Sequence, residues 1–129
     1  MSISYRAAQT LIKRDDEPGL HTALDTGLDA NLVNKNGWTL LMLAALEGSV
    51  TLGKLLLGKG AQIDARNQHG ETALSLAAQK GHTEFLQLLK DRGASAGCKP
   101  HGTSLVLWLT NSPGLSKSTL AEVRGILGI

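Results

Sequence analysis

The chain has 129 residues, a formal net charge of +2 and a single cysteine, Cys98. This length suits one domain, and so small a charge gives no reason to expect nucleic acid or a membrane surface as a ligand. One cysteine excludes an internal disulfide and fits a reducing compartment, so we expect a cytoplasmic protein. Aromatic residues make up only 3%, so leucine and alanine must fill the core, which favours packed helices over a sandwich or barrel.

The first elements that the pattern predicts are a helix over residues 4–14 and a second helix from Pro18 to Leu24. Proline is tolerated in a first helical turn because its missing N–H has no partner there. The opening residues lack the uninterrupted apolar stretch of a secretion signal, and no later run is long enough to span a bilayer. We therefore expect no association with a membrane.

An internal repeat is the clearest signal, because residues 34–66 align with residues 67–99 at an offset of 33. The twelve identical pairs are Asn34/Asn67, Gly37/Gly70, Thr39/Thr72, Leu41/Leu74, Leu43/Leu76, Ala44/Ala77, Ala45/Ala78, Gly48/Gly81, Leu55/Leu88, Leu56/Leu89, Gly60/Gly93 and Ala61/Ala94. A fixed period of this length is typical of a stacked-repeat solenoid, in which each unit buries its apolar face against its neighbours.

Each repeat unit is predicted to begin with a short helix that carries one buried face. Thr39 and Thr72 stand immediately before these helices, where a threonine hydroxyl can accept a hydrogen bond from a free backbone N–H. Leucine and alanine recur at the i, i+3, i+4 spacing of a buried helical face. Gly48 and Gly81 stand where the helices should end with a positive φ.

A second helix is predicted after each of those glycines, followed by a polar excursion. Residues 61–71 are too polar and glycine-punctuated for helix, so we expect an extended segment with a tight turn near residues 67–70. Gly53 and Gly58 lie inside the earlier second helix, and each would lower its stability by up to ~1 kcal/mol relative to alanine. We therefore expect a modestly stable array.

The two copies resemble the ankyrin-repeat family. Its pattern, D-x-x-G-x-T-P-L-H-x-A-A-x-x-G-H followed by an apolar helix and L-L-x-x-G-A-x-V-N-A, is similar to NKNGWTLLMLAALEGS with LLLGKGAQIDA and to NQHGETALSLAAQKGH with LLKDRGASAGC. The resemblance implies an all-α ankyrin-repeat solenoid of stacked helix-turn-helix units joined by extended hairpin-like loops. The family's Pro–Leu–His step is absent from both copies, which again predicts modest stability. His82 matches the family's Gly–His position and is expected to be structural.

About four repeats are expected, and together they would form a single domain. Residues 1–33 and 100–129 would be degenerate N- and C-terminal capping repeats around the central repeats 34–66 and 67–99. In the last unit, Gly102 and Ser104 take the glycine and threonine positions, with helices over residues 106–110 and 119–127. Trp108 would fill the terminal core, because it stands where the repeats have leucine.

No motif points to catalysis, a cofactor or a metal. The segment GLSKST (114–119) lacks the glycine frame of a phosphate-binding loop, so Ser116 or Ser118 is expected to cap the last helix instead. Cys98 and His101 have a ligand-like spacing, but zinc needs four ligands and no further pair is convincing. No elbow or oxyanion motif supports a hydrolytic triad. We expect a protein that is not an enzyme.

The resemblance implies that a partner protein binds the concave side, made of turn tips and exposed positions of the first helices. The expected partner-binding residues are Lys35, Asn36, Trp38, Leu46, Glu47, Gln68, His69, Glu71, Gln79 and Lys80. Trp38 and Leu46 are the expected anchors, because the next repeat has polar Glu71 and Gln79 in their places. The alternative is that Trp38 folds over the capping repeat and Leu46 is merely tolerated.

The sequence therefore predicts a non-catalytic adaptor or scaffold that is monomeric on its own and binds a protein of unknown identity. An inhibitor or immunity-type protein that blocks a partner enzyme or toxin is the alternative. A module for small molecules or nucleic acid is disfavoured, because no stripe of basic residues is present.

Overall fold

The computed structural model describes residues 4–129, and within that range it contains eight α-helices, one 3₁₀ turn and no β-strand. The helices are α1 (Tyr5–Lys13), α2 (Glu17–Asp25), α3 (Leu40–Glu47), α4 (Val50–Gly58), α5 (Ala73–Lys80), α6 (Thr83–Asp91), α7 (Leu105–Thr110) and α8 (Lys117–Leu127), and the 3₁₀ turn is Pro100–Gly102. The predicted all-α class is confirmed.

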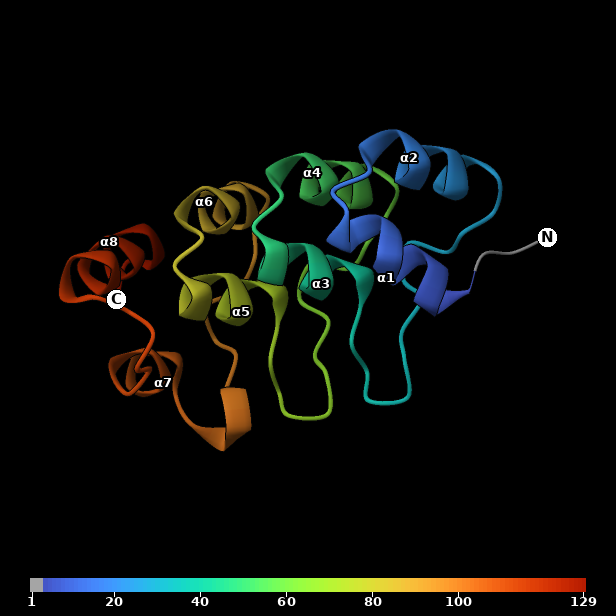
Figure 1. Ribbon diagram of the computed structural model, residues 1–129. Helices are drawn as coiled ribbons and strands as arrows, with labels where there is room; N and C mark the ends of the chain where they lie inside the picture. The colour runs from blue at the N-terminus through green and yellow to red at the C-terminus, as the bar shows by residue number, and fades with distance from the viewer. Residues whose placement is uncertain (1–3) are drawn as a thin grey trace.

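The helices form two rows, which Figure 1 shows from the side. The inner row consists of α1, α3, α5 and α7, and the outer row of α2, α4, α6 and α8. Within each row, every helix packs against the next, so that α3 lies between α1 and α5. Finger-like loops extend from the inner row away from the outer row (Figure 1). This is the stacked solenoid that the repeat period predicts.

The inner helices begin and end where the sequence pattern places their boundaries. The Thr39 hydroxyl accepts from the backbone N–H of Met42 at 3.1 Å, and Thr72 does the same for Ser75 at 3.2 Å. The Ser75 hydroxyl in turn accepts from the Thr72 N–H at 2.9 Å and closes a capping box. Gly48 and Gly81 end the helices with φ of 72° and 73°. These local signals determine the bounds of α3 and α5.

The core lies between the two rows and consists almost entirely of leucine and alanine. The alanine pairs of α3 and α5 are fully buried, which lets the inner helices approach closely. Phe85 is the largest fully buried side chain in the described range. His82, on the loop between α5 and α6, ties two repeats together because its Nε2 lies 3.0 Å from the carbonyl oxygen of Leu46. Its expected structural role is confirmed.

Several boundaries differ from those predicted. Ser4 caps α1 instead of belonging to it, and Ser116, one of the two predicted caps, starts α8 two residues early at Lys117. Helix α2 begins at Glu17, where Asp16 accepts from the backbone N–H of Gly19.

Trp108 packs against the core but is only half-buried, so it fills the terminal core incompletely.

Gly53 allows close packing between two helices, which the sequence pattern did not reveal. A Cβ atom added there would lie 2.7 Å from Cε2 of Phe85, because α4 and α6 pack closely at this point. At Gly58, by contrast, the same atom would meet open space. The expectation that both glycines merely weaken α4 is therefore wrong for Gly53, whose missing side chain allows the packing of two repeats.

Candidate functional site

A groove of about 260 Å³ opens on the inner-helix side of the first two units. Its walls come from α1, from the first finger loop and from α3. The lining residues are Tyr5, Gln9, Asn34, Asn36, Trp38, Leu43 and Leu46. Three expected partner-binding residues, Asn36, Trp38 and Leu46, therefore meet in one groove.

Trp38 is placed by the hydrogen bonds of its finger loop. Its backbone N–H donates to Oδ1 of Asn34 at 3.0 Å, and its carbonyl accepts from the Asn34 N–H at 3.2 Å. The same Asn34 oxygen accepts from the N–H of Asn36 at 3.0 Å. The indole is half-buried against the core, so one part is held while another part lines the groove.

Leucine side chains continue the apolar wall beside Trp38. Leu43 and Leu46 are both half-buried and belong to α3, whose opposite face is fixed in the core. The carbonyl of Leu46 is further held by the His82 ring. The groove thus rests on elements that are already ordered before any ligand binds.

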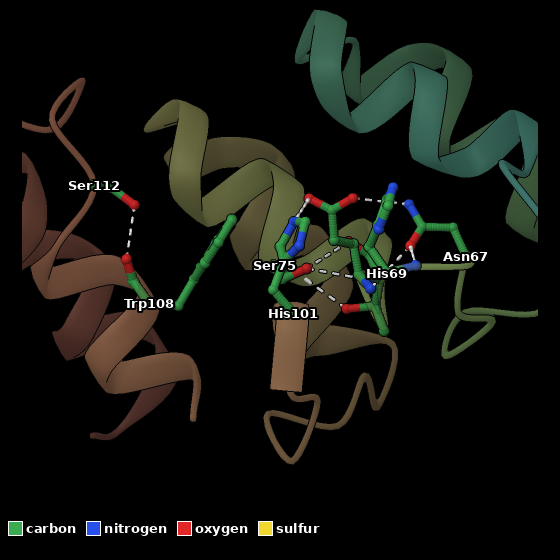
Figure 2. Close-up of polar contacts among 8 residues, drawn as sticks. Asn67, His69, Ser75, His101, Trp108 and Ser112 are labelled. Atoms are coloured by element: carbon green, nitrogen blue, oxygen red, sulfur yellow. Dashed lines mark hydrogen bonds and ion pairs between the residues drawn. The ribbon is translucent and has the colours of Figure 1, made fainter. Parts of the chain in front are cut away.

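The equivalent place in the next unit has a different structure, which Figure 2 shows. Asn67 donates from Nδ2 to Oε1 of Glu71 at 2.9 Å, and its own Oδ1 accepts from the backbone N–H groups of His69 and Glu71. Nε2 of His101 lies 3.7 Å from Oε2 of Glu71. Glu71 is only 7% exposed. Its predicted place in an exposed polar rim is wrong, because the finger loop and a neighbouring histidine enclose the carboxylate.

Stacked rings link this second loop to the last unit. The His69 ring stacks on His101 with centroids 4.8 Å apart, and His101 stacks on Trp108 at 4.9 Å. The backbone N–H of His101 donates to the carbonyl of His69 at 2.7 Å, and that of Gln68 donates to the carbonyl of Asn36 at 2.9 Å. The finger tips are therefore bonded to one another along the array.

The remaining expected residues are spread along the inner side instead of gathering in the groove. Lys35, Glu47, Gln68, His69 and Lys80 are exposed. Gln79 is half-buried and lines, with Lys80, a separate hollow next to the loop between α7 and α8. The structure therefore divides the expected set into a groove group and a dispersed polar group.

Sequence reasoning missed four groove residues: Tyr5, Gln9, Asn34 and Leu43. Tyr5 and Gln9 come from the first unit, whose repeat pattern is too weak to align position by position. Burial raises the pKa of the Tyr5 hydroxyl. Leu43 was missed because it is identical to Leu76 in the next repeat. That identity indicated a purely structural role, although Leu43 also lines the groove.

Residues 4–129 contain no cluster of histidine, cysteine and acidic side chains that could hold a metal. None of their helices combines the length and apolar character needed to cross a bilayer. The lone Cys98 is buried, and that burial raises the pKa of its thiol.

Comparison with known families decides the class of the protein. A family model described as ankyrin repeats, in three copies, matches residues 5–100. The chain belongs to the ankyrin-repeat family. Ankyrin repeats indicate a protein–protein interaction module and are generally non-enzymatic. No curated protein sequence matches the chain closely enough to count as a relative.

The last ankyrin-like unit lies beyond the matched residues and follows the same plan. Helix α7 packs against α5, and α8 packs against α6, as the earlier pairs do. Ser104 caps α7, with its hydroxyl accepting from the Leu107 N–H at 3.4 Å. The array therefore continues to the end of α8 although the repeat pattern fades.

Proposed function

We propose that this ankyrin-repeat protein is an adaptor or scaffold that binds one partner protein through its inner-helix side, without catalysis of its own. The groove formed by Tyr5, Trp38, Leu43 and Leu46 carries the proposal. Apolar side chains that remain accessible on an ordered frame are the usual anchors of protein interfaces, where tryptophan is enriched.

The contrast between two equivalent positions supports a binding role for Trp38. Thirty-three residues later, Glu71 is enclosed by Asn67 and His101 and stabilises its own finger loop. Trp38 makes its loop hydrogen bonds through backbone atoms, which any residue except proline could provide. Its indole is therefore not needed to form the loop, and a ligand-binding task accounts for its presence.

The rigidity of the frame supports tight binding by a modest surface. Finger tips bonded to one another and helices fixed in the core lose little conformational freedom when a ligand binds. Around the groove, Lys35, Asn36 and Glu47 would supply the polar rim, and Gln68, His69, Gln79 and Lys80 would extend it along the array. We place Glu71 as a support for that surface and not as a direct contact.

The test is affinity capture from the native source with the wild-type protein and with Trp38→Ala and Leu46→Ala variants. The proposal predicts one partner that both variants lose. Ile129→Ala is the matched control, because Ile129 is 37% exposed and follows α8, which belongs to the outer row. Equal capture by all four proteins would contradict the proposal. If the captured partner is an enzyme that loses activity on binding, the protein acts as an inhibitor.

A further inference from the structure

We propose that the groove takes an acidic segment of a partner protein, with one large apolar side chain inserted beside Trp38. This inference rests on the proposed function and specifies the chemistry of the ligand. Two independent features of the inner side carry it: the excess of exposed basic residues along that side, and the size and lining of the groove.

Charge is unevenly divided between the two sides of the array. The inner side consists of the inner helices, the turn tips (residues 34–37, 67–70 and 99–102) and the short links from tip to helix (residues 38–39, 71–72 and 103–104). Its five exposed basic residues are Arg6, Lys13, Lys35, Lys80 and Lys99. Its only exposed acidic residue is Glu47. Glu71 is buried, and its carboxylate is occupied by Asn67 and His101. The surface offered to a ligand is therefore basic, although the whole chain carries only +2.

The outer row and its loops hold the other acidic residues of the chain. These are Asp15, Asp16, Glu17, Asp25, Asp29, Asp64, Glu84, Asp91 and Glu122. Some of them already have partners: Asp25 accepts from Nζ of Lys59 at 2.6 Å, and Asp15 accepts from the Ser49 hydroxyl at 2.6 Å. Basic residues on that side are mixed with these acids, so only the inner side can attract an acidic ligand over a distance.

The volume and open shape of the groove favour a side chain over a small molecule as its ligand. Small-molecule sites commonly have about 300–1,000 Å³ and are largely enclosed. This groove has about 260 Å³, is open, and is lined both by the aromatic and aliphatic side chains of Tyr5, Trp38, Leu43 and Leu46 and by the amides of Gln9 and Asn36. It suits one large apolar side chain, while these amides can bond the peptide backbone that carries it.

Lys35 and Arg6, which are next to groove residues in the sequence, would then meet the carboxylates that flank the apolar residue. Lys35 lies on the same finger loop as Trp38, and Arg6 follows Tyr5 on α1. Exposed charges contribute mainly to the rate and selectivity of association, and their effect weakens with salt. Affinity would therefore come from the groove, and selectivity for acidic sequences from its basic surroundings.

The experiment is selection from a displayed library of short random peptides on the immobilised full chain, with counter-selection on Trp38→Ala. The expected peptides carry one large apolar residue flanked by more aspartate and glutamate than the starting library. A synthetic copy of the best peptide should bind roughly fivefold more weakly at ~0.5 M salt than at ~0.05 M salt. Lys35→Glu should weaken it severalfold, whereas Lys54→Glu, an exposed lysine on α4, should not.

The outcomes separate this inference from the proposed function. Peptides that depend on Trp38 but show no excess of acidic residues would overturn the inference and leave the proposed function standing. Peptides whose binding ignores Trp38 would count against both. A labelled DNA duplex that bound as tightly as the acidic peptide at the same salt concentration would also overturn the inference, because the basic surface would then serve nucleic acid.

Discussion

Two equivalent asparagines show how single residues hold the finger loops. The Oδ1 of Asn34 accepts from the N–H groups of Asn36 and Trp38, and the Oδ1 of Asn67 accepts from those of His69 and Glu71. Asn67 is 7% exposed, whereas Asn34 is half-buried. In each turn, the asparagine side chain thus accepts hydrogen bonds from the backbone in place of a backbone carbonyl. Because Asn67 is buried, the second turn depends more on its asparagine than the first turn does.

We expect Asn67→Ala to lower the free energy of unfolding by about 1–3 kcal/mol, because it leaves the buried N–H of Glu71 without its acceptor and the Glu71 carboxylate with His101 alone. Asn34→Ala should cost only about 0.5–1 kcal/mol, because water can replace the lost acceptor. Urea unfolding of both variants measures the difference. Equal losses would show that burial of the second loop does not matter.

Cys98 offers a second test at this scale. Its thiol is buried and its pKa is raised, so the thiolate that reacts with alkylating agents forms only at a higher pH than in a free thiol. Iodoacetamide should therefore label the folded protein severalfold more slowly than the urea-unfolded protein at pH 8, and the rate should rise more steeply above that pH. Mass spectrometry follows the labelling. The same rate in both states would rule out the described burial.

At the scale of elements, the two glycines of α4 separate helix propensity from packing. Gly58→Ala should raise the free energy of unfolding by about 0.5–1 kcal/mol, because the added methyl group meets open space and alanine favours helix. Gly53→Ala should lower it by about 1–3 kcal/mol, because the methyl group collides with Phe85. Thermal unfolding of the two variants checks both signs. If Gly53→Ala were stabilising, the close packing of α4 on α6 would be wrong.

The sequence predicted the helices because their signals are local. Thr39, Thr72, Gly48 and Gly81 determine where α3 and α5 begin and end through contacts within a few residues. The burial of Glu71 depends on His101, thirty residues further along, so a comparison of repeats could not reveal it. Leu43 shows the opposite limit: identical residues in two repeats need not have the same exposure.

At the scale of the whole molecule, positions with the same residue in different repeats build the frame, and positions with different residues have different surroundings. The alanine pairs and the cap residues agree and build a frame in which each unit supports the next. Trp38 and Glu71 differ, and the structure gives them different surroundings: a groove for one and an enclosed hydrogen-bond network for the other. The monomeric state of the free protein stays a prediction, which light scattering after size exclusion can test.

The central claim is that Trp38 and Leu46 anchor the partner, and titration calorimetry of the captured partner against purified variants tests it most directly. We predict that Trp38→Ala lowers affinity by at least about 2 kcal/mol, roughly thirtyfold, and Leu46→Ala by about 1 kcal/mol or more. Ile129→Ala should bind as wild type does, and circular dichroism should show that all variants are folded. Wild-type affinity in folded Trp38→Ala would contradict the account.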